Sequence, residues 1–295
     1  MAGHDGRRGV ERLFRAHRQR EGAGFVVRRP FPAQGLELVD PFLLLDEMGP
    51  VDYGPGEAVG APDHPHRGFE TVTYVLEGES FHEDSAGHQG TLGPGDVQWM
   101  TAGAGIVHSE VPSRKLRERG GRMHGFQLWV NLPRSDKRMA PRYQEISNEK
   151  IPIAHTEDGL AEVRVLAGRS LGASAVIETR TSIAYLDWTL RPGARVEVPV
   201  SPEHQAFAYV FRGEARLGDD ERAVGDGQLA LLTDGGTIRL AAPPDATGPA
   251  RLLLISGTPL REPVARYGPF VMNTEAEIEE AVEDYRNGRM GLIRR

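Results

Sequence analysis

The stretch 63–110 constrains the fold of this chain most strongly, because short β-branched segments alternate there with glycine and proline turns. Residues 70–76 are rich in valine, threonine and tyrosine, and the turns that follow contain Gly78, Gly87 and the segment 93–96. Short strands at such close spacing, separated by turn residues, are typical of β-sandwiches and barrels. The sequence therefore predicts an all-β fold.

Two pairs of potential metal ligands flank this β-rich stretch. His64 and His66 precede it, and His108 and Glu110 end it. Residues two apart on a strand point to the same face, so each pair can reach one ion. Three imidazoles and one carboxylate suit Fe, Mn, Co, Ni, Cu or Zn rather than Mg or Ca. Because the chain has no cysteine, thiolate ligands are excluded.

Longer motifs around these pairs resemble a known family. Residues 64–74 (HPHRGFETVTY) and 95–103 (GDVQWMTAG) are similar to segments of the pirin family, which belongs to the cupin superfamily. The resemblance is strongest over about the first half of the chain. It implies two cupin-type β-barrel or jelly-roll domains in tandem, with the metal site in the first.

The resemblance also bears on which carboxylate joins the histidines, a choice that spacing alone leaves open. General cupins usually use a glutamate at the position of Glu70, whereas pirins use the position of Glu110. The implied metal ligands are His64, His66, His108 and Glu110. Glu70 then stays a candidate for orienting a ligand imidazole.

Other histidines and aromatic residues are weaker candidates for the site. Trp99 and His124 are candidates to line its pocket, although tryptophans on strands, including Trp129, more often belong to the core. His82 and His88 are interpreted as solvated loop or strand-end histidines. Spacing identifies no catalytic residue beyond the metal ligands.

The second half of the chain repeats the first half without its metal donors. Residues 201–214 follow the order and spacing of residues 62–79, and later glycine turns recur as well. Only His204 remains of the first histidine pair, and residues 237–241 contain Arg239 but no histidine or glutamate. We therefore predict a structural cupin domain at 141–272, with His204 buried or hydrogen-bonded.

Both ends of the chain carry their own signals. Residues 1–22 are rich in arginine and predict a flexible basic segment before a metal-binding domain at 23–140. Thr274 and Glu277 have the spacing of a capping box, followed by apolar residues at helical spacing. We therefore expect a C-terminal helix within 273–295 that packs as a lid on a barrel.

Composition narrows the classes of function. The 295 residues are 39% hydrophobic and 26% charged, as in globular proteins, and the net charge of −7 argues against direct nucleic-acid binding. No apolar run approaches the length of a membrane span, and no signal-peptide core follows the N-terminal basic residues. We expect a cytoplasmic protein without a membrane partner.

The ligand set and the resemblance together define the expected function. Four protein donors on an octahedral ion leave positions for water, O2 or a chelating substrate. The resemblance implies one divalent ion, Fe(II) first, and quercetin 2,3-dioxygenase activity as in several pirins. We therefore expect an oxidoreductase that opens a flavonol-like ring with O2. The alternative is a non-enzymatic regulator whose metal redox state controls binding to a transcription factor or metabolic enzyme.

Overall fold

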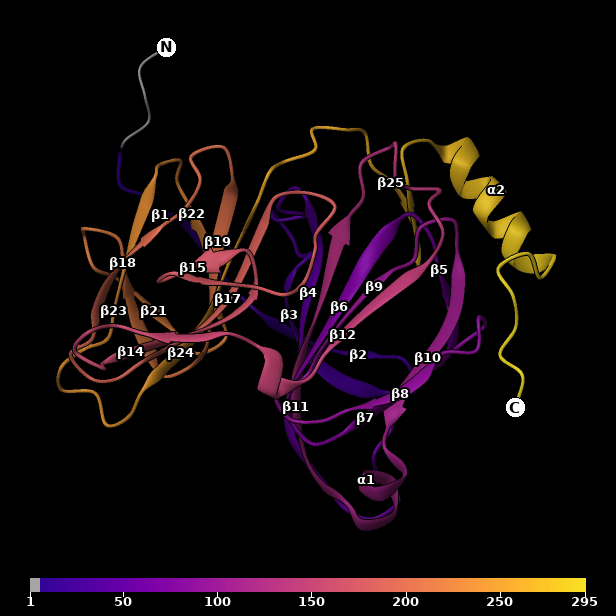
Figure 1. The fold of residues 1–295 in the computed structure, drawn as a ribbon, viewed down its shortest axis with the longest axis horizontal. Coiled ribbons are helices and arrows are strands. Elements are labelled where there is room, and N and C mark those ends of the chain that lie inside the picture. The colour runs from indigo at the N-terminus through magenta and orange to yellow at the C-terminus, as the bar shows by residue number, and fades with distance from the viewer. Residues whose placement is uncertain (1–5) are drawn as a thin grey trace. The chain divides into compact units, whose positions relative to one another are not determined.

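β-Strands form most of this protein, which we describe for residues 6–295 from a computed structural model (Figure 1). The described chain divides into two units. The first unit contains residues 18–148 and 260–295, and the second contains residues 6–17 and 149–259. Each unit has one seven-stranded and one four-stranded sheet, so both are cupin-type β-sandwiches with open sheets rather than closed barrels.

The first unit carries the segment with the predicted metal ligands. In order across its larger sheet, the strands are β12 (Arg142–Ile146), β9 (Val97–Thr101), β6 (Phe69–Glu77), β11 (Gly121–Asn131), β4 (Phe42–Tyr53), β3 (Phe25–Phe31) and β2 (His17–Glu21). Its smaller sheet contains β5 (Ala61–His66), β10 (Ile106–Pro112), β7 (Ser80–Asp84) and β8 (Gln89–Leu92). A short helix, α1 (Arg114–Arg119), follows β10.

The second unit repeats this arrangement. Its larger sheet contains, in order, β1 (Val10–Arg15), β22 (Gln228–Leu232), β19 (Gln205–Arg212), β24 (Ala250–Gly257), β17 (Ile183–Leu190), β14 (Ala161–Ala167) and β13 (Ile153–His155). Its smaller sheet contains β18 (Arg195–Pro199), β23 (Thr237–Ala241), β20 (Glu214–Leu217) and β21 (Arg222–Gly225). The short elements are η1 (Asn148–Lys150), β15 (Arg169–Ser170) and β16 (Ala173–Ser174). Strand β19 holds the place of β6, and β23 that of β10, so the internal repeat seen in the sequence is structural.

The N-terminal segment differs from the flexible arm that its arginines predict. Strand β1 pairs with β22, and Leu13 packs against the apolar core of the second unit. The buried side chain of Arg8 donates hydrogen bonds to the carbonyl oxygens of Ser201, His204 and Thr233. These long-range contacts hold residues 8–15 in the second unit, and residues 17–21 form β2 of the first unit. Residues 1–5 of the predicted arm lie outside the described residues.

The boundary predicted between the two domains also differs from the structure. Strand β12 pairs with β9, so the first unit extends to residue 148 rather than 140. His204 of the second unit is buried, and its ring nitrogens lie 3.1 Å from the hydroxyls of Ser256 and Ser182. These contacts agree with the prediction of a hydrogen-bonded histidine.

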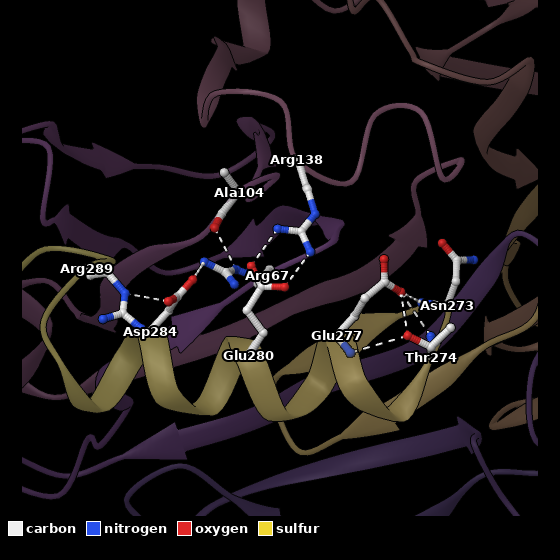
Figure 2. Close-up of polar contacts among 9 residues, drawn as sticks. All are labelled: Arg67, Ala104, Arg138, Asn273, Thr274, Glu277, Glu280, Asp284 and Arg289. Atoms are coloured by element: carbon white, nitrogen blue, oxygen red, sulfur yellow. Dashed lines mark hydrogen bonds and ion pairs between the residues drawn. The ribbon is translucent and has the colours of Figure 1, made fainter.

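The C-terminal segment returns to the first unit. It contains β25 (Ala265–Tyr267), β26 (Phe270–Met272) and helix α2 (Glu275–Arg286). The predicted capping box of Thr274 and Glu277 is confirmed, as Figure 2 shows. Ile278 and Ala281 of α2 pack in one apolar cluster with Val107 of β10, beside predicted ligand His108. Among the described residues, no helix has the length and apolar character needed to cross a membrane.

A buried lysine joins this returning segment to the rest of the first unit. The Lys137 ammonium donates hydrogen bonds to the carbonyl oxygens of Gly68 at 2.8 Å and Val271 at 3.1 Å, and to Asn131 at 2.6 Å. Burial lowers the pKa of Lys137 to about 8, although Glu262 acts in the opposite direction. Gly68 follows His66 closely in sequence, so the lysine supports the turn beside the predicted ligands.

The lowered pKa of Lys137 predicts a pH-dependent stability. Between about 8 and the ordinary value of 10.5, the unfolded state binds more protons, so the free energy of unfolding rises with pH. The contribution is up to about 3 kcal/mol across that window. Chemical denaturation gives the free energy of unfolding of wild type and of Lys137→Met at each pH. From pH 8 to pH 10, the free energy of unfolding of wild type should rise relative to that of the variant. If the difference between the two free energies of unfolding stayed constant over this pH range, the lowered pKa of Lys137 would be contradicted.

Candidate metal site

Two paired strands bring the predicted histidine ligands together. His64 and His66 end β5, and His108 lies opposite His64 on β10. The Nε2 atom of His64 is 3.0 Å from Nε2 of His66 and 3.0 Å from Nε2 of His108. Two nitrogens bound at about 2.1 Å and at right angles to one ion are separated by about 3.0 Å. The distances of His64 to His66 and of His64 to His108 are therefore those of adjacent ligands on an octahedral ion.

The protonation chemistry of these histidines also fits metal ligation. His64 Nδ1 lies 2.7 Å from the Pro62 carbonyl, and a proton donated there leaves the Nε2 lone pair available. Burial lowers the pKa of His66 well below its ordinary value, with further lowering by His64 and His108. Burial likewise lowers the pKa of His108 to about 4, against the opposing effect of Glu110. Both buried rings are neutral at pH 7, the form that binds metals.

Glu110 lies beside the histidine cluster. Its Oε2 atom is 3.8 Å from His108 Nε2, while the three ligand nitrogens all lie within 4.8 Å of one another. Thr73 donates a hydrogen bond to Oε1 at 2.7 Å, and Gln127 donates one to Oε2 at 2.8 Å. Burial opposes ionisation of Glu110, but His108, His64 and these two hydrogen bonds outweigh it and lower its pKa. The carboxylate is thus ionised and held facing the histidines.

The two residues that hold Glu110 were not identified from the sequence. Thr73 and Gln127 are cross-strand partners of β6 and β11. Cross-strand partners point to the same face of a sheet, so both reach the carboxylate from one side. The signal that could have identified them is a pair of polar residues facing each other on the inner side of the sheet. This signal can be read only when the register between β6 and β11 is known.

We predict that Thr73→Val weakens metal binding without unfolding the protein. The substitution keeps the side-chain shape and removes the hydrogen bond to Glu110. Loss of a partner that orients a ligand typically lowers metal affinity about 10- to 100-fold. A competition titration with a chromophoric chelator measures the change, with Thr91→Val at an exposed strand position as control. Equal affinities of the two variants would contradict a role for Thr73 in orienting Glu110.

Trp99 and Glu70, the other candidates for the site, face away from the histidines, contrary to the prediction. Thr73 pairs with Gln98 and Val72 pairs with Trp99 across β6 and β9, so Trp99 lies on the face opposite Thr73. Glu70, two residues before Val72, shares that opposite face and accepts a hydrogen bond from Thr101 at 2.6 Å. Neither side chain is therefore placed to contact the cluster.

The remaining histidines differ from one another in environment. His88 is exposed, as predicted, with Nδ1 3.0 Å from Asp84. His82 is buried, contrary to prediction, and its Nε2 lies 2.7 Å from Glu145. His124 is buried with Nε2 2.9 Å from Glu47, and it lines a small cavity near the cluster. Strand pairing, which single-sequence patterns do not reveal, buries the last two.

Two cavities of the first unit adjoin the cluster. The larger, about 470 Å³, is lined in part by His64, His66 and Trp129. The smaller, about 60 Å³, is lined in part by Glu110 and His124. Gln127 contributes to both walls. The larger volume is within the range of pockets that enclose small organic molecules, so a ligand there would contact the exposed side of the histidine cluster.

Comparisons with known proteins agree with this architecture. Residues 24–130 match the family model described as Pirin, and residues 185–291 match the Pirin C-terminal cupin domain. A pirin-like protein of Solanum lycopersicum is 45% identical over 279 residues, which cover 95% of this chain and 91% of that protein. Pirin of Rattus norvegicus is 44% identical over 279 residues, covering 93% and 90%. A crystal structure of quercetin 2,3-dioxygenase from Acinetobacter baumannii is 36% identical with a TM-score of 0.91, covering 98% of this chain and 100% of that chain.

Proposed function

The chain belongs to the pirin family, and on this basis we propose that it is a metal-dependent dioxygenase that opens the ring of quercetin-type flavonols with O2. The observation that carries the proposal is the cluster of three imidazoles with an ionised carboxylate beside it, of which His64 and His66 line a cavity of about 470 Å³. The likeness to a solved quercetin 2,3-dioxygenase supports the choice of reaction.

Each side chain has a defined part in this proposal. The metal ligands would be His64, His66, His108 and Glu110, and their nitrogen and oxygen donors fit Fe(II) as the divalent ion, with Mn, Co, Ni, Cu or Zn as other occupants. When bound, the ion supplies Lewis-acid binding of an enolate oxygen and electron transfer to O2. Thr73 and Gln127 keep the carboxylate ionised and directed at the histidines.

Trp129 would help to position a flat substrate. Its ring is 5.2 Å from the ring of His66 and lines the same cavity. Aromatic rings pack against one another in stacked or edge-to-face geometry, so a flavonol can contact this indole while its oxygens approach the ion. The side chains around the histidines therefore orient the substrate and shield the reacting ring from water.

Aerobic turnover tests the proposal directly. Full-length protein loaded separately with each first-row divalent ion is mixed with quercetin, and flavonol absorbance and dissolved O2 are followed together. We expect equimolar consumption of both with at least one metal, and none with metal-free protein. No consumption with any metal would overturn the dioxygenase proposal and favour the metal-dependent regulator instead.

A further inference from the structure

An arginine near the proposed metal ligands has no acidic partner within ion-pair distance among the described residues. Arg266, on β25, lines the larger cavity together with His64 and His66. Its guanidinium carbon is 4.9 Å from the centre of the Trp129 ring, and one N–H group donates to the Leu43 carbonyl at 3.2 Å. Since Trp129 also contacts the His66 ring, one indole separates the guanidinium from a proposed metal ligand.

The other charged groups of this cavity are already paired. Both oxygens of Asp46 accept hydrogen bonds from Arg29, which also reaches Glu21 at 2.9 Å. Asp63 pairs with Arg295 at 2.6 Å. Asp46 and Glu21 thus share Arg29, and Asp63 pairs with Arg295, while the carboxylates of Asp46, Glu21 and Glu37 act on Arg266 only from beyond ion-pair distance. The N–H groups of Arg266 that do not bond to Leu43 therefore stay available to a ligand.

The chemistry of this arginine selects a particular kind of ligand. A guanidinium has five N–H donors in one plane, and the Leu43 carbonyl accepts from only one of its nitrogens. The guanidinium lies over the indole ring, and its remaining N–H groups can donate to a planar anion such as a carboxylate. The same indole presents an aromatic surface to the ring that carries the anion.

We propose that Arg266 is a specificity residue that binds an anionic oxygen group on an aromatic substrate, whose other oxygens reach the metal. The inference rests on the proposed dioxygenase function and narrows its substrates to planar aromatic compounds with a second anionic group, a carboxylate or a phenolate. A structural role for Arg266, limited to covering Trp129, would give no preference between charged and neutral ligands.

A matched pair of catechols tests this assignment. The probes are 3,4-dihydroxybenzoate and its neutral amide, 3,4-dihydroxybenzamide, titrated by calorimetry under anaerobic conditions into full-length protein with and without Fe(II). The variants are Arg266→Gln, Arg266→Lys and Arg114→Gln. The last removes the same charge from an exposed position of α1 that does not line the cavity.

We expect wild type and Arg114→Gln to bind the carboxylate about tenfold more tightly than the amide. Arg266→Gln should bind both probes with the affinity that wild type has for the amide, and Arg266→Lys should retain part of the preference. Equal binding of the two probes to wild type, an unchanged preference in Arg266→Gln, or no binding of either probe would overturn the proposal. If the carboxylate preference persists without Fe(II) while the protein consumes no flavonol, the assignment of Arg266 stands and only the dioxygenase function is rejected.

Discussion

Replacing His66 with alanine is expected to abolish stoichiometric metal binding. His66 is 2% exposed and neutral, and its Nε2 lies 3.0 Å from that of His64. Its loss removes a proposed ligand, so the effect should exceed the roughly 10- to 100-fold loss expected from removing an orienting partner. Elemental analysis of protein purified without chelators, followed by competition titration, measures both occupancy and affinity.

Thermal stability provides a second measurement on the same variant. A metal present at 100 times its dissociation constant stabilises the folded state by about 2.7 kcal/mol. Wild type should show this gain, and His66→Ala should show none at the same metal concentration. His88→Ala, at an exposed histidine, serves as the control and should behave as wild type. Equimolar metal in His66→Ala would show that this residue is not a ligand.

Breaking the ion pair between Arg67 and Asp284 is expected to destabilise the first unit. Arg67 directly follows His66, and its guanidinium donates to Asp284 of α2 and to the Ala104 carbonyl, both at 2.6 Å (Figure 2). The two side chains are 8% and 15% exposed. Breaking a fully buried pair costs about 3–5 kcal/mol. Because Asp284 is partly exposed and also pairs with Arg289, we expect Asp284→Asn to cost about 2 kcal/mol.

The same helix supplies a matched control for this prediction. Arg138 and Glu280 form a bidentate pair, but both side chains are about half exposed. Exposed pairs contribute about 0–1 kcal/mol, so Glu280→Gln should change the unfolding midpoint little. Urea unfolding of the metal-free variants gives the comparison. Asp284→Asn should also weaken metal binding, since Arg67 connects the turn after His66 to Ala104. Equal stabilities of the two variants would contradict this account.

Local signals in the sequence predicted a large part of this structure. The capping box of Thr274 and Glu277 identified the start of α2, because the interaction lies within one helical turn. The His-x-His spacing identified two residues on one face of β5, which the structure brings close to His108. The family resemblance and the internal repeat together indicated two cupin units of one architecture.

Contacts between distant segments could not be predicted in the same way. Every residue of β9 is buried, so the polar and apolar alternation that would separate Gln98 from Trp99 is absent. Trp99 was therefore a pocket candidate until the pairing with β6 placed it on the opposite face. The apolar stripe of α2 likewise showed that it packs on a surface, but not that this surface belongs to the first unit.

The return of residues 260–295 to the first unit sets the order in which a growing polypeptide can complete its metal site. Translation delivers the proposed ligands and both main sheets of that unit before residue 149. The Val271 carbonyl that Lys137 binds, and the Asp284 carboxylate that Arg67 binds, are synthesised only after the last strand of the second unit, β24. On the ribosome, Lys137 and Arg67 therefore lack these two contacts until the second unit has been synthesised, and the turn beside the proposed ligands is held by all of its partners only after that.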